Sequence, residues 1–128
     1  METPAIRARS GCPIATTLDL LGDRWTLVIV RDLLTGKSRF AELASSPERI
    51  PTNVLAARLK HMEASGLIQR RPYQERPVRH AYALTDRGAR LLPVLQAMCR
   101  WANLEFPSTW RPPDGFMRRR SPRPRSRR

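Results

Sequence analysis

The stretch PTNVLAARLKHMEASGLI, residues 51–68, decides the fold because it predicts a helix that ends at a glycine and continues as a strand. On a helical wheel, three apolar residues fall on one side and predict a buried face: Leu55, Leu59 and Met62. The opposite face holds small, polar or basic side chains and no acidic one: Asn53, Ala57, Lys60 and Ala64. Thr52 is the expected N-cap of this helix, and Gly66 its expected end.

The segments upstream predict three further helices. A proline at the first helical position and a glycine after the last apolar residue delimit the first, from Pro13 to Gly22. The second, over 24–34, is apolar around nearly its whole circumference and is expected to be central and buried. A short third helix is expected to be capped by Ser38 or a neighbour. Its expected buried pair is Phe40 and Leu43.

Downstream, the pattern predicts a two-stranded hairpin and a final helix. Residues 67–73 read as a strand and 74–77 as a turn, and a returning strand alternates through Val78, His80, Tyr82 and Leu84. A helix is expected from Thr85-Asp86 onward, with a kink at the proline inside it, Pro93. This order, mainly α with a small β-hairpin, is that of a winged helix-turn-helix domain with an added first and last helix.

Composition divides the chain into three parts. Residues 1–11 read as a flexible N-terminal arm, 12–105 as one folded domain, and 106–128 as a disordered tail rich in arginine and proline. The chain carries 24 Lys and Arg against 11 Asp and Glu, a formal net charge of +13. Residues 111–128 hold eight arginines and one aspartate, so the rest of the chain is basic as well. A basic body predicts a polyanionic partner, with nucleic acid first and an anionic membrane surface second.

Several classes of protein are disfavoured by what the sequence lacks. It has no signal peptide and no apolar run long enough to span a membrane, so we expect a cytoplasmic protein without membrane contact. Two cysteines, Cys12 and Cys99, predict neither a disulfide framework nor a metal set, and the two histidines lack partners at ligand spacing. No catalytic motif is recognisable. We therefore expect no enzyme, no metal and no cofactor.

The acid-free face of the helix at 52–65 has two interpretations. One is a solvated surface helix. The other is a helix that enters the major groove of double-stranded DNA, where small side chains permit close approach. In that case the residues that face DNA are Thr52, Asn53, Ala57 and Lys60, with Arg58 reaching a phosphate.

The hairpin that follows is rich in arginine. Arg76 and Arg79 are expected to contact the phosphate backbone or the minor groove. An edge hairpin that its arginines keep soluble is the alternative.

Two further sites are expected at the ends of the folded part. Cys12 stands at the start of the first helix, where the helix dipole favours a thiolate, so it is a candidate redox sensor or target of a small reactive effector. A purely structural cysteine is the alternative. The first and last helices also have more apolar surface than a small core needs, which predicts a homodimer, with packing within the chain as the alternative. The residues expected at its interface are Ile14, Leu18, Leu91, Leu95, Met98 and Trp101.

Taken together, the motifs resemble those of the HxlR family of bacterial winged helix-turn-helix transcriptional regulators. The matching segments are Cys12-Pro13, LDLLGDRWTLVIVRDLL (18–34), RFAEL (39–43), IPTNVLAARLKHME (50–63), SGLIQRRPY (65–73), YALTDRG (82–88), LLPVL (91–95) and Cys99-x-Trp101. The resemblance implies a homodimer, formed through the first and last helices, that binds operator DNA. It implies a recognition helix at 52–65, a wing at 73–80, and a position for Cys12 at which some members sense reactive species.

The chain departs from the family at His80-Ala81, where an apolar residue and then a charged one, often Glu, are usual. A salt bridge at the base of the wing is therefore not expected. The long basic tail is a second departure.

The sequence thus predicts a sequence-specific, DNA-binding transcriptional regulator, a repressor rather than an activator, that binds a palindromic operator as a homodimer. The alternative is a nonspecific architectural, nucleoid-type DNA-binding protein whose tail and body neutralise phosphates. A protein-interaction or membrane-binding module that uses the basic tail is the third reading.

Overall fold

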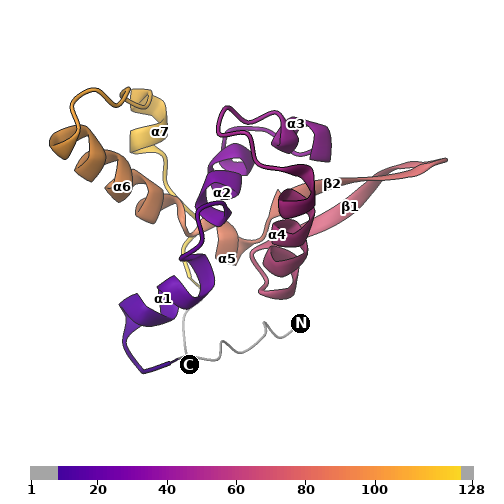
Figure 1. Cartoon of the computed structure of the whole chain (residues 1–128), viewed down its shortest axis with the longest axis horizontal. Coiled ribbons are helices and arrows are strands. Elements are labelled where there is room, and N and C mark those ends of the chain that lie inside the picture. Colours follow the sequence, from indigo (N-terminus) through magenta and orange to yellow (C-terminus); the bar gives the residue numbers. More distant parts are fainter. Residues whose placement is uncertain (1–8, 125–128) are drawn as a thin grey trace.

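A computed structural model describes residues 9–124, which form a body of short helices and one hairpin (Figure 1). The elements are α1 (Pro13–Leu21), α2 (Thr26–Leu34), α3 (Phe40–Ala44), α4 (Thr52–Ala64), β1 (Ile68–Glu75), β2 (Val78–Leu84), α5 (Asp86–Ala89), α6 (Leu92–Glu105) and α7 (Asp114–Arg118). The hairpin projects from one side of the body, and α1 and α6 lie on the other side (Figure 1). This mainly α arrangement with a small hairpin is the winged helix-turn-helix fold that the sequence predicts.

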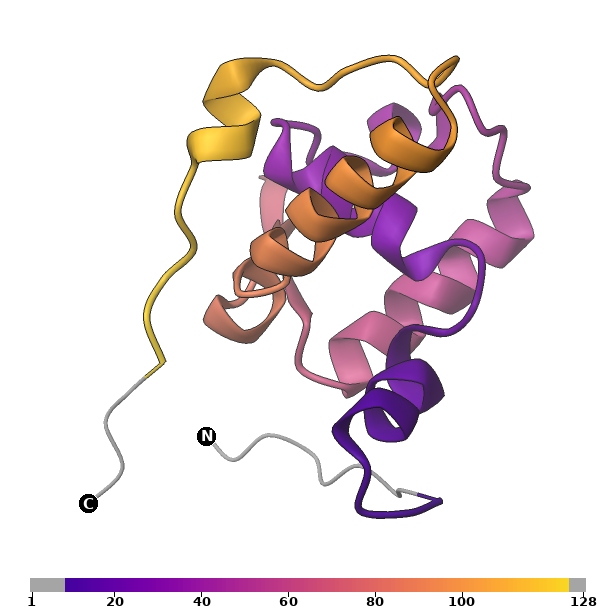
Figure 2. The same ribbon diagram turned by 90° about the vertical axis from the view of Figure 1, so that its left-hand side faces the viewer.

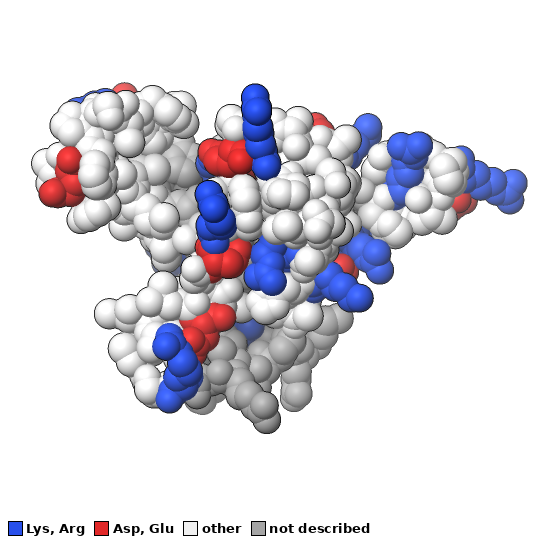
Figure 3. Space-filling view, viewed as in Figure 1, with Lys and Arg blue, Asp and Glu red and all other residues white. Residues whose placement is uncertain are grey.

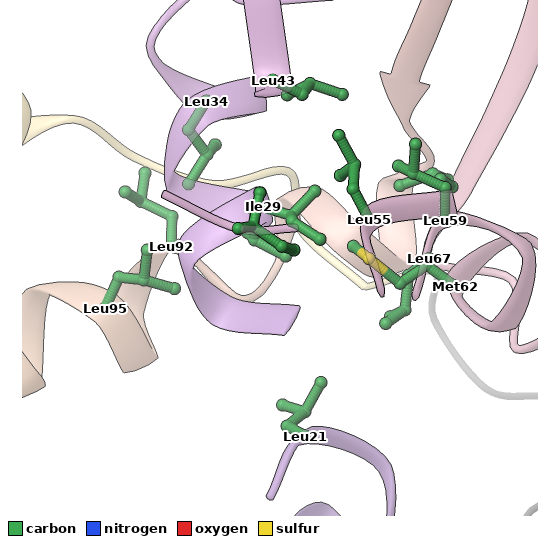
Figure 4. Packing of buried hydrophobic residues seen from close by; sticks show 13 residues of the cluster. Leu21, Ile29, Leu34, Leu43, Leu55, Leu59, Met62, Leu67, Leu92 and Leu95 are labelled. Atoms are coloured by element: carbon green, nitrogen blue, oxygen red, sulfur yellow. The ribbon is translucent and has the colours of Figure 1, made fainter. Parts of the chain in front are cut away.

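Helix α2 forms the centre of the core, as its apolar sequence predicts. Ile29 of this helix is buried. It lies between two leucines of α6, Leu92 and Leu95, on one side and Leu55 of α4 on the other (Figure 4). Burying one large aliphatic side chain contributes about 1.5–3 kcal/mol, so these contacts fix α4 and α6 against α2. The buried cluster consists of Leu21, Ile29, Val30, Leu34, Leu43, Ile50, Leu55, Leu59, Met62, Leu67, Ile68, Leu92 and Leu95.

The start of α2 is set by the carboxylate of Asp23. It accepts hydrogen bonds from the backbone N–H groups of Trp25 and Thr26, both at 2.9 Å, and from the buried Thr26 hydroxyl. Partial burial raises the pKa of Asp23, but these hydrogen bonds outweigh it and bring the pKa below its ordinary value. The motif GDRWT therefore places α2 two residues later than the predicted start at 24.

The hairpin is antiparallel, with Ile68 opposite Leu84 at its base and a bulge between Pro72 and Gln74. The segment before α3 is joined to the hairpin by an isolated bridge: Arg39 pairs with Ala81, and the Tyr82 N–H donates to the Ser38 carbonyl at 2.7 Å. These bonds fasten the wing to the start of α3.

The segment LTDRG fastens α5 to the end of α4. The Thr85 hydroxyl donates to the Gly66 carbonyl and accepts from the N–H of Gly88 at 3.2 Å, so one side chain caps α5 and holds the turn after α4. Gly66 has a φ of 77°, a conformation that favours glycine, and it ends α4 as predicted.

Two predictions about helix ends are wrong. Thr52 does not cap α4: it is the first helical residue, and Pro51, in an extended conformation, occupies the N-cap position without a side-chain hydrogen bond. Pro93 does not kink a continuous final helix, because the chain forms two helices, α5 and α6, with Pro93 in the first turn of the second. Proline has no N–H to donate and its ring clashes with a preceding turn, so it begins a helix more readily than it continues one.

The prediction that nothing packs beyond Phe106 is also wrong for part of the tail. Residues 114–118 form α7, and Phe116 packs against the core. Of the predicted N-terminal arm, residues 1–8 lie outside the described part of the chain, and Arg9 forms an ion pair with Asp19 at 2.6 Å.

Candidate nucleic-acid interface

The outer face of α4 is exposed and lacks an acidic side chain, as the helical wheel predicts. Its apolar side is buried in the core, through Leu55, Leu59 and Met62. The exposed residues of the helix are Thr52, Asn53, Ala56, Ala57, Lys60, His61 and Ala64. The acid of the helix, Glu63, is half-buried and lies 3.4 Å from Arg70 of β1. The exposed face therefore offers small side chains, an amide and an ammonium to an approaching surface.

Arg58 lies on the flank of α4 rather than on this face. Its guanidinium is 3.7 Å from the Asp23 carboxylate, and its side chain is only 30% exposed. The pair joins α4 to the turn before α2. A phosphate contact by Arg58 remains a prediction.

The backbone N–H groups in the first turn of α4 donate no hydrogen bond to a capping side chain. The carbonyl of Pro51 accepts from the Leu55 N–H at 2.9 Å, whereas no side chain caps the helix. Such a terminus carries partial positive charge, which favours a nearby anion. The two predicted contact residues Thr52 and Asn53 stand in this turn and are exposed.

A polar cluster that the sequence analysis missed holds the loop ahead of α4. The Arg31 guanidinium of α2 donates to both oxygens of Glu48, at 2.6 and 2.8 Å, and to Asp32 at 2.9 Å. Asp32 is buried and also accepts from the buried Ser46 hydroxyl. The hydrogen bond from Arg31 lowers the pKa of Glu48, and the same contact raises the pKa of Arg31.

No local signal identifies this cluster, because its partners are far apart in the sequence, Arg31 and Glu48 by 17 positions. These contacts hold the loop from Ser46 to Pro51 against α2, and they thereby position the first turn of α4.

The hairpin presents basic side chains along its length. In Figure 3 its projecting end carries Lys and Arg with few acidic residues. The predicted contact residues Arg76 and Arg79 are exposed, as is Arg71. Arg39 instead stacks over Tyr73, with its guanidinium carbon 4.3 Å from the ring centroid. Where the family usually places a charged residue at 81, this chain has an alanine bridged to Arg39.

The predicted dimer residues fall into two groups. Ile14 and Leu18 of α1 are 72% and 55% exposed, and Met98 and Trp101 of α6 are 50% and 61% exposed. Leu95, in contrast, is 6% exposed within the chain. Its assignment to an interface is wrong, because it faces α2 and belongs to the core.

Leu91, the remaining predicted interface residue, is half-buried against the same core. Four of the six predicted interface residues are thus left uncovered on two helices that lie on one side of the molecule (Figure 1).

The two cysteines differ in their surroundings. Cys12 is exposed at the N-cap position of α1, and Cys99 is partly buried in α6. Burial raises the pKa of the Cys99 thiol, more than the neighbouring Arg100 lowers it. Two arginines close to Cys12 in the sequence have partners of their own: Arg9 pairs with Asp19, and Arg24 stacks on Trp25.

Within residues 9–124, no three His, Cys, Asp or Glu side chains come together as a metal site would require. No helix of that same part is long and apolar enough to cross a membrane.

Comparison with known proteins places the chain among transcriptional regulators. A family model described as HxlR-like helix-turn-helix matches residues 20–109. YvaP of Bacillus subtilis (strain 168), an uncharacterized HTH-type transcriptional regulator, is 39% identical over 92 residues, which are 71% of this chain and 85% of YvaP. YdeP of the same organism, named likewise, is 36% identical over 91 residues, 71% of each chain.

Solved structures agree with this match. The reduced form of the transcriptional regulator YodB from B. subtilis superimposes with a TM-score of 0.63 at 35% identity, over 77% of this chain and 97% of YodB. The redox regulator HypR in its reduced form gives a TM-score of 0.67 at 30% identity, over 73% of this chain and 93% of HypR. The acid-free helix, the wing and the family match converge: the chain belongs to the HxlR-like helix-turn-helix family of transcriptional regulators.

Proposed function

We propose that the chain binds a palindromic operator as a homodimer and regulates transcription, as a repressor rather than an activator. The observation that carries the proposal is the exposed, acid-free face of α4 beside a wing of exposed arginines. Such a regulator acts where the chromosome is, so a cytoplasmic location is part of the proposal. Membership of the family supports DNA as the partner.

In this proposal α4 enters the major groove. Thr52 and Asn53 stand at its leading end and Ala57 and Lys60 along its exposed face, so amide and ammonium groups meet base edges while Ala57 gives clearance. The wing follows the backbone with Arg76 and Arg79. In a two-fold dimer the two half-sites lie about 34–36 Å apart, one turn of DNA.

The uncovered apolar residues of α1 and α6 support the homodimer. Ile14 and Leu18 on one helix and Met98 and Trp101 on the other are large apolar side chains left exposed in the single chain, which favours burial against a second copy. A two-fold interface uses the same patch on both copies, which two helices on one side of the molecule can provide.

We further propose that Cys12 senses a peroxide or an electrophile. Its thiol is exposed at a helix N-terminus, and the neighbours YodB and HypR have been solved in reduced forms and in diamide-treated or oxidized forms. Attack of the Cys12 sulfur on one peroxide oxygen would break the O–O bond, leaving a sulfenic acid on the protein and releasing water or an alcohol. Addition of the thiol to a quinone would instead form a carbon–sulfur bond, with the ring becoming a hydroquinone.

The test of operator binding is to sequence the fragments that the purified full-length protein selects from genomic DNA, followed by footprinting. A recurrent palindrome protected by the protein is the expected result. Selection of random fragments, with protection that covers them evenly, would instead favour the architectural alternative.

Deletion of the basic end of the chain also distinguishes a sequence-specific regulator from a nonspecific architectural protein. Because Gln96 and α7 hold residues up to Arg119, the informative deletion is 120–128 rather than the whole tail. A regulator should keep its preferred site with a smaller salt dependence, whereas a nonspecific binder should lose most of its affinity.

For the sensor, DNA binding is measured after peroxide or quinone treatment of wild type, Cys12→Ser and, as a control, Cys99→Ser. Treatment should change the affinity of wild type and of Cys99→Ser but not of Cys12→Ser. A Cys12→Ser protein that responds like wild type removes Cys12 from sensing.

A further inference from the structure

The hairpin is joined to the body near its base, and its tip, residues 74–79, extends beyond these contacts (Figure 1). At the base, Arg39 bridges to Ala81, and the Tyr82 N–H donates to the Ser38 carbonyl. A two-stranded hairpin on its own is only marginally ordered in water. The direction of the tip therefore depends on any contact that the hairpin makes farther out than this bridge.

The tip is held together as one unit. The Gln74 side chain is half-buried, and its amide donates to the carbonyls of Arg76 and Pro77 at 3.3 and 3.1 Å. These bonds close the turn from within. A change of direction in the strand that leads into the turn therefore carries the whole tip with it, including the exposed side chains of Arg76 and Arg79.

Tyr73 lies where such a change of direction occurs. The pairing of β1 with β2 passes directly from Pro72 to Gln74, so Tyr73 is the extra residue of a bulge. A bulge bends its strand and redirects a side chain. Here the Tyr73 ring meets the guanidinium of Arg39, whose central carbon lies 4.3 Å from the ring centroid, well within the distance of a cation–π contact.

Arg39 reaches this ring by crossing β2. It pairs with Ala81, and Ala81 pairs on its other side with Arg71 of β1. Residues directly opposite one another in an antiparallel pair point to the same face, and neighbouring strands lie about 4.8 Å apart. The Arg39 side chain therefore extends over Ala81 toward β1, and the small side chain of Ala81 leaves this path open.

From these contacts we propose that the Arg39–Tyr73 stack sets the direction of the hairpin tip, and thereby determines how Arg76 and Arg79 meet the DNA backbone. Arg39 and Tyr73 are positioning residues, because they act through the two arginines of the tip. The second step rests on the proposed DNA-binding function. The first step concerns the free protein and does not.

The order of the tip is tested by NMR on the full-length protein without DNA. Tyr73→Phe keeps the aromatic face and Tyr73→Leu removes it, and neither variant changes the charge. In wild type and Tyr73→Phe, the ring should shift the side-chain protons of Arg39 upfield, and the amides of the tip should have order parameters near the rigid value of about 0.85. In Tyr73→Leu the upfield shift should vanish and the order parameters should fall to about 0.6 or below. A tip that stays equally ordered in Tyr73→Leu contradicts the proposal.

Two alanines of β2 provide a matched pair of variants. Ala81→Leu should obstruct the path of Arg39 and reproduce the effects of Tyr73→Leu. Ala83→Leu makes the same change two positions along the strand, opposite Gln69, and should behave as wild type. If Ala81→Leu keeps both the upfield shift and the ordered tip, Arg39 does not reach the ring across β2, and the proposal is overturned.

The effect on DNA is measured by titrating a selected fragment in a double-mutant cycle. Tyr73→Leu alone should weaken binding about two- to fivefold, the factor that corresponds to one exposed cation–π contact. In a chain that already carries Arg76→Ala and Arg79→Ala, the same change should cause no further loss. A tyrosine that supports only the fold would weaken binding by the same factor in both backgrounds, and that result overturns the second step.

The measurements also separate the proposal from the proposed function. If wild type binds no DNA while Tyr73→Leu loosens the tip, the proposed function fails and the role of the stack in the free protein stands. If Tyr73→Leu loosens the tip of a protein that still binds DNA with unchanged affinity, the second step fails.

Discussion

Gly88 is the point at which α5 comes closest to the segment after α4. A Cβ atom at this position would lie 2.1 Å from the Leu67 carbonyl oxygen and 2.9 Å from a methyl carbon of Leu84. The backbone oxygen cannot yield without breaking the Thr85 N–H bond to the same carbonyl, at 3.0 Å. A glycine is therefore required here by close approach.

We expect Gly88→Ala to destabilise the protein by about 1–3 kcal/mol, the usual range for overpacking. Urea unfolding followed by circular dichroism measures the change. Gly115→Ala is the control, because a Cβ there meets no atom within 4 Å. Equal stability of the two variants would show that α5 can move away.

Lys60 should contribute to DNA binding without contributing to the fold. It is exposed on α4, so Lys60→Ala should leave the unfolding midpoint unchanged. If Lys60 contacts a base, operator affinity should fall by roughly 1–3 kcal/mol. If it contacts a phosphate, the slope of log affinity against log salt concentration should become smaller by about one. Salt-controlled titrations decide between these. Arg100→Ala, an equal loss of charge on α6, is the control; unchanged affinity of the Lys60 variant would remove it from the interface.

Asn53 should act on specificity more than on total affinity. Its amide stands in the exposed first turn of α4, where it can donate to and accept from a base edge. Asn53→Ala should lower the ratio of operator to random-DNA affinity by about 1–3 kcal/mol, the usual cost of one lost base contact. Parallel losses on operator and on random DNA would count against base readout at this position.

At the scale of elements, periodicity carried most of the prediction. The buried side of α4 and the pairing of β1 with β2 follow from local spacing, and both are observed. The helix ends were harder, because single neighbouring residues decide them: the carboxylate of Asp23 starts α2, and Pro51 occupies the N-cap position expected for Thr52. The sequence analysis missed the folded part of the tail around α7. That part is held by the Gln96 side chain, which lies 20 residues before Phe116 and belongs to no motif.

The ion pair between Arg31 of α2 and Glu48 of the loop before α4 should make the free energy of unfolding fall at acid pH. Arg31 lowers the pKa of Glu48 below its ordinary value of 4.5. The pair therefore stabilises the fold fully above pH 4.5, and the contribution is lost as the pH falls through the lowered pKa. Because Glu48 is partly exposed, we expect about 1 kcal/mol or less.

Glu48→Gln should flatten the decline of stability between neutral pH and the acid range. Unfolding free energies at several pH values measure this, with Glu105→Gln, at the exposed end of α6, as the control. A decline as steep in Glu48→Gln as in wild type would show that the pair adds nothing to folding.

At the scale of the whole molecule, the surfaces assigned to DNA and to self-association lie on different sides. The hairpin projects to one side and α1 and α6 lie on the other (Figure 1), while the described end of the chain is opposite α4 (Figure 2). The arginines up to residue 124 therefore do not extend the α4 face of their own chain. In the proposed dimer, α1 and α6 would form the interface and leave the α4 face of each copy free to meet one half-site of a two-fold operator.

Leu18→Asp should separate the two copies without unfolding either one. Leu18 is 55% exposed in the single chain, so an aspartate there stays hydrated in the monomer but would be buried in the dimer, where an unpaired charge is costly. Sedimentation at micromolar concentration should show a monomer, and operator affinity should fall because only one half-site is held at a time. Val78→Asp, which also places a charge at an exposed apolar residue but on the hairpin, should remain a dimer. A Leu18→Asp protein that sediments as a dimer would move the interface away from α1.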